Sequence, residues 1–318
     1  MPTPYGKPWL SYTDQLQLLK SRGLIVTDES LATEHLERIG YYRFSGYLYP
    51  FRKTEWDQNN YCLVVKDDFK TGTTFEIVSD LYVFDKNLRL ILLDALERIE
   101  ISLRAKFAYI LGKYDPIAHL NPTFFNHNIP RFNHQETVNK INKMVAESKI
   151  ACITWNKRKY GSQIPIWVSC QIWDFGTINK LYLGLKPHYQ KEISLQFGIK
   201  NPSTFNSWIF SLNYLRNICA HHSRLWNLNM VINPKFKGSL FDSHIPTISK
   251  RCFEHCLVAN YFVNKICPRS EWSNRFMKTI EQFPDFSSIE FSNRESTDSI
   301  TLKAAGFPSN WKSLWAIK

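Results

Sequence analysis

The stretch that decides the fold is Phe75–Gly112, which reads FEIVSDLYVFDKNLRLILLDALERIEISLRAKFAYILG. Its apolar side chains recur every three or four residues, which is the spacing of one face of an α-helix. No proline or glycine interrupts the run before Gly112, and Asp115-Pro116 follow as stop signals. The pattern predicts one long helix at the centre of a helical bundle, with an apolar face made by Ile77, Leu81, Phe84, Leu88, Ile91, Leu92, Ala95, Ile99 and Leu103.

The chain before this helix predicts small elements. Residues 8–37 carry the capping residues and apolar spacing of two short helices that turn at Gly23. Residues 54–74 indicate a polar connection with strand-like pieces such as Tyr61–Val65, and Thr73-Thr74 would cap the long helix. Residues 1–74 therefore form a predicted N-terminal helical region.

The chain after the long helix predicts further helices. Helical patterns occupy residues 135–149, 165–182, 186–197, 252–267 and 271–282, and a helix that starts at 201. A polar loop is expected to hold His119, His127 and His134 at the surface. The fold class is therefore mainly α, with a helical core over residues 75–235, and C-terminal helices and a docked aromatic tail over 236–318.

The formal net charge of +12 is concentrated in one part of the chain. Residues 124–240 contain 15 basic and 4 acidic side chains, whereas the rest is nearly balanced. Such a surface is either merely solvated or attracts a polyanion. Within it, Lys157, Arg158 and Lys159 belong to a predicted basic aromatic loop over 155–161, and Arg224 follows later. These four side chains are candidate RNA contacts.

A second group of candidate RNA contacts lies in residues 39–52, where aromatic rings and arginines alternate. Unpaired bases stack on aromatic faces and on guanidinium planes. The alternative is that these rings pack the core and Arg43 pairs with a carboxylate. The candidates are Tyr41, Tyr42, Arg43, Tyr47 and Arg52.

Cysteine usage and hydropathy indicate a cytoplasmic protein. Seven dispersed cysteines resemble reduced thiols more than a disulfide framework. No apolar run approaches the roughly 20 residues that span a bilayer, and the start lacks the pattern of a secretory signal. Cys252-x-x-His255-Cys256 has no second half with zinc-like spacing, so neither a metal nor a cofactor is predicted.

The candidate chemistry lies in Leu212–Trp226, LNYLRNICAHHSRLW, which contains Arg216, His221 and His222. A histidine exchanges protons near neutral pH, and a guanidinium holds phosphate oxygens. Asn217 lies four residues before His221 and would orient its ring through a hydrogen bond.

The helical position of Arg216 predicts a partner. On a regular helix Arg216 lies about 20° from Phe205, inside the apolar stripe, and its permanent charge then needs a carboxylate or a phosphate. Glu100 on the long helix is the expected partner, and Glu97 and Arg104 flank it. Arg216 and His221 would lie about 140° apart, which favours a shared cleft between two copies of the chain. The alternative is that Arg216 is a buried structural arginine and His221 a surface histidine, without a shared chemical role.

A resemblance gives this motif more weight. Arg216-Asn217-x-x-x-His221 resembles the Rx4–6H signature of HEPN-domain ribonucleases, and LRNICAHHSRLWN is similar to the Abi-like abortive-infection proteins AbiD and AbiF. Similar strings at 39–47, 95–104, 165–177 and 306–311 extend the match over most of the chain.

The resemblance implies a HEPN-like helical bundle and a role in bacterial phage defence. It implies a toxin-like endoribonuclease that uses the RNA 2′-hydroxyl as nucleophile, without a metal, with Arg216, His221, Asn217 and His222 at the site. The expected partners are RNA, including a small regulatory RNA, and a second copy joined through the motif helix. The alternative function is an RNA-binding protein of the same defence system that does not cleave.

Overall fold

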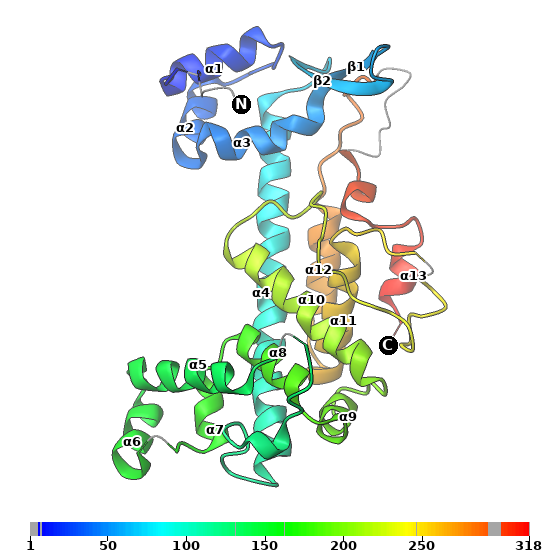
Figure 1. The fold of residues 1–318 in the computed structure, drawn as a ribbon. Coiled ribbons are helices and arrows are strands. Elements are labelled where there is room, and N and C mark those ends of the chain that lie inside the picture. Colours follow the sequence, from blue (N-terminus) through cyan, green and yellow to red (C-terminus); the bar gives the residue numbers. More distant parts are fainter. Residues whose placement is uncertain are drawn as a thin grey trace. The chain divides into compact units, whose positions relative to one another are not determined.

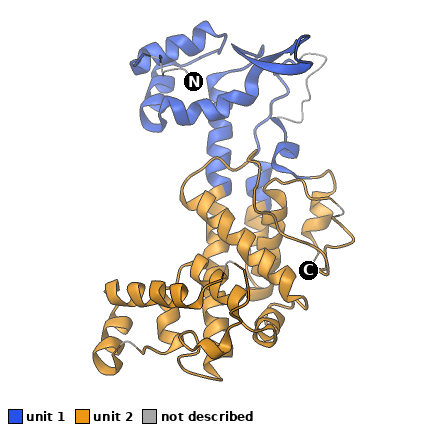
Figure 2. Cartoon of the chain, in the orientation of Figure 1, with its two compact units in different colours: residues 1–88, 277–307 blue, residues 89–276, 308–318 orange. Residues whose placement is uncertain are grey.

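The computed structural model describes residues 6, 8–130, 132–161, 163–245, 247–291 and 300–317. It confirms that the chain is mainly α, with one two-stranded sheet among the described residues (Figure 1). The chain forms two compact units (Figure 2). Unit 1 comprises residues 1–88 and 277–307, and unit 2 comprises 89–276 and 308–318.

Unit 1 begins with the predicted helical hairpin. Ser11 caps the first helix and Asp28 the second, each by accepting a hydrogen bond from a backbone N–H in the first turn. Residues 52–69 form an antiparallel hairpin, so the polar connection is more regular than its sequence indicates. The elements are α1 (Tyr12–Ser21), α2 (Glu29–Ile39), α3 (Tyr41–Leu48), η1 (Tyr49–Phe51), β1 (Arg52–Asp57), β2 (Cys62–Phe69), the start of α4 (Phe75–Gly112) and η5 (Leu302–Ala305).

The aromatic side chains of residues 39–52 are divided between the core of unit 1 and its surface. Tyr47 is buried, and its hydroxyl donates a 2.6 Å hydrogen bond to the Asp85 carboxylate. Phe44 packs on Phe75 with ring centroids 4.7 Å apart. The predicted RNA contact at Tyr47 is therefore wrong, because helix α3 turns this ring inward. Tyr42, in contrast, is 92% exposed.

A close backbone approach in unit 1 requires glycine at position 72. Gly72 has φ +84°, and a Cβ there would lie 2.2 Å from the Ser288 carbonyl oxygen. We expect Gly72→Ala to lower the free energy of unfolding by about 1–3 kcal/mol, measured by urea denaturation. Gly40 has φ +83° and open space around it, so Gly40→Ala measures the conformational cost without a steric clash. Equal losses in the two variants would contradict the steric explanation.

Unit 2 is a helical body whose core includes α10 and α11. Every residue from Phe253 to Val263 is buried, and the Trp208 ring of α10 is fully buried and donates a 2.8 Å hydrogen bond to the Lys235 carbonyl. Besides the rest of α4, the elements are η2 (Pro122–Phe124), α5 (His134–Glu147), α6 (Ala151–Tyr160), α7 (Ile166–Ser169), η3 (Cys170–Ile172), α8 (Phe175–Gly184), α9 (Pro187–Leu195), α10 (Pro202–Ala220), α11 (Phe253–Ile266), α12 (Trp272–Glu281), which extends into unit 1, and α13 (Trp311–Trp315).

Several local predictions for unit 2 need correction. Residues 155–160 continue helix α6 and do not form a loop, because nothing interrupts the helix before Gly161. The helix predicted over 165–182 breaks at Asp174, which caps α8. His119 and His134 are buried, because the His119 ring packs against Trp173 and His134, the first residue of α5, packs against Phe125. The tail docks as expected, since Phe307 and Trp311 are buried. Among the helices described, none combines the length and apolarity that crossing a membrane requires.

Burial of His119 predicts a loss of stability in acid. Desolvation lowers the pKa of His119 to about 4, against the attraction of Asp115 and with a smaller lowering effect of His134. The unfolded chain takes up this proton below about pH 6.5, whereas the folded chain resists until about pH 4. Stability therefore falls between these pH values, by about 3 kcal/mol for this one group.

Substitution tests this account. A His119→Phe protein is expected to show a flatter dependence of the urea midpoint on pH between 7 and 4. The exposed His127 serves as control, since His127→Phe should keep the wild-type slope. An unchanged slope in His119→Phe would show that other groups cause the acid effect.

Candidate active site

The two histidines of the motif lie at the C-terminus of helix α10. The helix ends at Ala220, earlier than a regular helix through His222 would, and His221 is its C-cap residue. The His222 N–H bonds to the Cys219 carbonyl (3.1 Å) and the Ser223 N–H to the Ile218 carbonyl (3.0 Å). This is the Schellman pattern, which satisfies the last carbonyls of the helix.

The Schellman pattern places His222 where glycine is usually found. Its φ of 56° is left-handed, which costs roughly 1 kcal/mol for a side chain with a Cβ. Both histidines are exposed. The backbone therefore holds two imidazoles next to each other at the surface.

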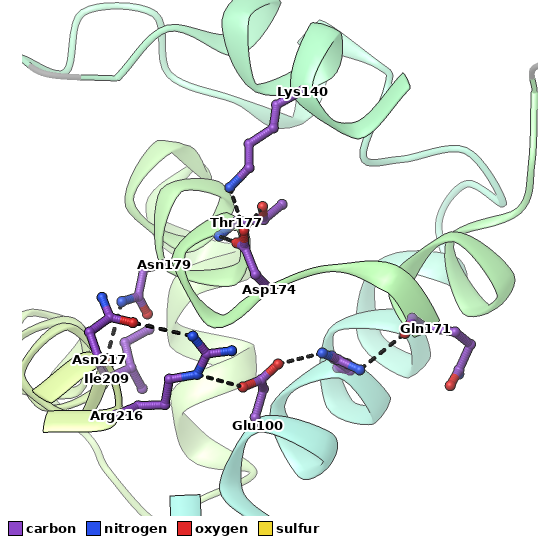
Figure 3. A network of polar contacts seen from close by, with 10 residues as sticks. Glu100, Lys140, Gln171, Asp174, Thr177, Asn179, Ile209, Arg216 and Asn217 are labelled. Carbon is purple, nitrogen blue, oxygen red and sulfur yellow. Dashed lines mark hydrogen bonds and ion pairs between the residues drawn. The ribbon is translucent and has the colours of Figure 1, made fainter. Parts of the chain in front are cut away.

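Arg216 pairs with a carboxylate of α4. Its Nε lies 3.9 Å from Glu100 Oε2, which confirms the predicted partner. The other Glu100 oxygen accepts from Arg104, whose Nη1 also donates 3.1 Å to the Gln171 carbonyl (Figure 3). The Glu100 side chain is 11% exposed and that of Arg216 is 37% exposed. One carboxylate thus lies between two guanidinium groups, and the cluster keeps a net positive charge.

Asn217 has a different role from the predicted one. Its Oδ1 accepts a 3.3 Å hydrogen bond from Arg216 Nη1, as drawn in Figure 3. Its backbone carbonyl accepts from the His221 N–H at 2.9 Å. The Asn217 side chain therefore orients the guanidinium and not the imidazole.

Figure 3 also draws a second polar cluster, which the sequence reading missed. Lys140 donates a 2.7 Å bond to Asp174 Oδ2, and the backbone and hydroxyl of Thr177 bond to Asp174 Oδ1. Burial by itself would raise the pKa of Asp174, but the hydrogen bonds from Lys140 and Thr177 outweigh it and lower this pKa. The spacing Asp-x-x-Thr, an N-cap pattern, was the available signal.

The other predicted site residues have separate surroundings. Glu97 is exposed on α4. Lys157 donates to the Ala146 carbonyl at 2.9 Å, and Lys159 lies over the rings of Trp155 and Tyr160, at 4.9 and 5.2 Å from their centroids. Arg158 is exposed, and Arg224 is half-buried. In unit 1, Arg43 lies over the Tyr82 ring at 6.0 Å. Tyr41, Tyr42 and Arg52 line one groove.

Comparison with known families gives the class of this protein. The family described as Abi-like protein matches residues 34–227, which is more than half of the chain and includes the Arg216–His222 motif. The chain belongs to the Abi-like protein family. Searches of curated proteins and of solved structures find no match. Membership in an abortive-infection family suggests a role in defence against phage.

Proposed function

We propose that this Abi-like protein is a HEPN-type endoribonuclease that cuts RNA without a metal and acts as a regulated toxin in phage defence. One observation carries the proposal. Arg216, half-exposed and oriented by Glu100, lies on the same helix terminus that presents His221 and His222 to solvent. A cation and two exposed proton carriers on one helix are the groups that cleavage of a phosphodiester needs.

The reaction would be transesterification within the RNA. The 2′-oxygen forms a bond to its neighbouring phosphorus and loses its proton to one imidazole. The bond from phosphorus to the 5′-oxygen breaks, and that oxygen takes a proton from a second imidazole. Arg216 stabilises the charge that grows on the phosphate oxygens. His221 and His222 supply two imidazoles in one chain, and the products are a 2′,3′-cyclic phosphate and a 5′-hydroxyl.

A second copy of the chain would complete this site. The Glu100 ion pair directs Arg216 toward α4, whereas His221 follows the last residue of α10. In a homodimer joined through α10, the arginine of one copy could face the histidines of its partner. Isologous contacts of this kind are the commonest form of dimer.

The positive charge of residues 124–240 supports RNA as the partner. It carries 15 basic against 4 acidic side chains, and helix α6 ends in Lys157, Arg158 and Lys159. The same charges equally support the alternative function, which is an RNA-binding protein that does not cleave. A small regulatory RNA would be one partner of such a protein.

An assay with end-labelled RNA and EDTA separates the two functions. The nuclease predicts cleavage that EDTA does not stop, products ending in a cyclic phosphate, and no cleavage of an RNA whose 2′-hydroxyls are replaced by hydrogen. Intact RNA that stays bound to pure protein supports the binder. A protein that neither cuts nor binds RNA contradicts both.

A further inference from the structure

Unit 1 contains a groove that the motif of α10 does not explain. Its volume is about 850 Å³, and it is formed by the segment before α1, the start of α3 and the β1–β2 hairpin. Among its lining residues are Trp9, Tyr12, Tyr42, Arg22, Arg52 and Asp67. The groove thus combines aromatic rings with two arginines and one carboxylate.

The aromatic rings of the groove are exposed to an unusual degree. Trp9 is 87% exposed, Tyr42 is 92% and Tyr12 is 44%. Large rings that remain in water contribute little to the stability of the fold. Rings of this kind beside cations are the platforms on which unpaired bases stack.

The arginines of the groove hold an anion already. Arg22 Nη2 lies 3.0 Å from Asp67 Oδ2, and Arg52 Nη1 lies 3.0 Å from Asp67 Oδ1. The Arg22 and Arg52 side chains are 23% and 19% exposed, whereas the Asp67 side chain is 64% exposed. The Nε of Arg52 is buried and has no hydrogen-bond partner among the described residues. The arginine side chains are therefore mostly buried, whereas the carboxylate between them faces solvent, where another anion can compete with it.

We infer that this groove binds unpaired RNA nucleotides, whose bases stack on Trp9 and Tyr42 while a backbone phosphate replaces the Asp67 carboxylate between Arg22 and Arg52. A phosphate offers the same paired oxygens as a carboxylate to a guanidinium fork. Bases inside a duplex are already stacked, so the groove selects single strands. The inference rests on the proposed function in taking RNA as the partner of this protein, and it names the form of RNA that unit 1 selects.

Binding of labelled 12-nucleotide RNA to the full chain tests the stacking. All variants carry His221→Ala so that the strand stays whole, and binding is measured by fluorescence anisotropy. Trp9→Ala and Tyr42→Ala are expected to weaken binding of the single strand by about 5- to 100-fold each, and to leave binding of a duplex unchanged. Tyr61→Ala is the control, because Tyr61 is 79% exposed in the same unit but lies outside the groove.

A charge substitution tests the phosphate exchange in the opposite direction. Asp67→Asn removes the competing carboxylate, so the single strand should bind several-fold more tightly. Asp68→Asn is the control, because it makes the same change of charge on the next residue of β2. The Asp68 side chain belongs to neither ion pair of the groove. A gain of affinity cannot result from misfolding.

The binding results separate a failure of the proposed function from a failure of the groove inference. If the parent protein binds no RNA, the proposed function fails together with the inference. If the parent binds RNA and the Trp9 and Tyr42 variants bind the single strand as tightly as the parent does, only the groove inference is overturned. The same holds if these variants lose affinity for the duplex as much as for the single strand. Equal affinities of Asp67→Asn and Asp68→Asn overturn the exchange of phosphate for carboxylate.

Discussion

Replacing His221 with alanine is expected to lower RNA cleavage by about 10²- to 10⁴-fold, the usual contribution of a general acid or base. The fold should persist, because His221 is an exposed C-cap whose backbone N–H makes the structural bond. His244→Ala, at another exposed histidine of unit 2, should cleave like the parent. Cleavage at the parent rate by a folded His221→Ala protein would exclude His221 from catalysis.

His222 needs a separate variant, because its backbone is strained. His222→Gly removes the imidazole and at the same time relieves the left-handed φ of 56°. We expect this protein to be at least as stable as the parent and to cleave RNA slowly. Full cleavage by His222→Gly would mean that the residue only ends the helix. Arg216→Lys keeps the charge and loses the guanidinium fork, so it should also cleave slowly.

The second large effect is expected on stability, from Glu100→Gln. This change leaves Arg104 and Arg216 without their shared carboxylate in a largely buried place. Loss of one partner of a buried ion pair costs about 3–5 kcal/mol. Because Arg216 is 37% exposed, solvent screening should reduce this to about 2–4 kcal/mol of unfolding free energy.

A matched control and a double mutant make the Glu100 measurement specific. Glu97→Gln makes the same change at an exposed position of the same helix, and should stay within about 0.5 kcal/mol of the parent. Combining Glu100→Gln with Arg216→Gln should restore part of the loss, since the second change removes an unpaired charge. Equal unfolding free energies for the Glu100 and Glu97 variants would show that the ion pair does not stabilise the fold.

Helical periodicity was sufficient for most of the fold. Helix α4 begins at Phe75 and ends at Gly112 as predicted, because an uninterrupted apolar stripe and clear end signals leave no competing structure. The pairing of Arg216 with Glu100 was predictable for a related reason. A charge inside an apolar stripe needs a partner, and few carboxylates lie beside such a stripe.

Predictions that relied on composition were less successful. Basic and aromatic residues at 155–160 indicated a loop, yet they form the last turns of α6, since arginine and lysine are good helix formers. Polar neighbours suggested that His119 lies at the surface, but it is buried. Composition describes the average surroundings of a segment, whereas burial depends on what packs on it.

The sequence by itself determined most of the helices, several capping residues and the Arg216–His222 motif, because these depend on neighbours within a few residues along the chain. Only the tertiary structure decided that Tyr47 faces Asp85 while Tyr42 faces solvent. It also decided that Asn217 bonds to Arg216, and that Arg22 and Arg52 share Asp67. These contacts join side chains whose directions depend on where a helix stops and on which elements meet, and spacing along the chain specifies neither.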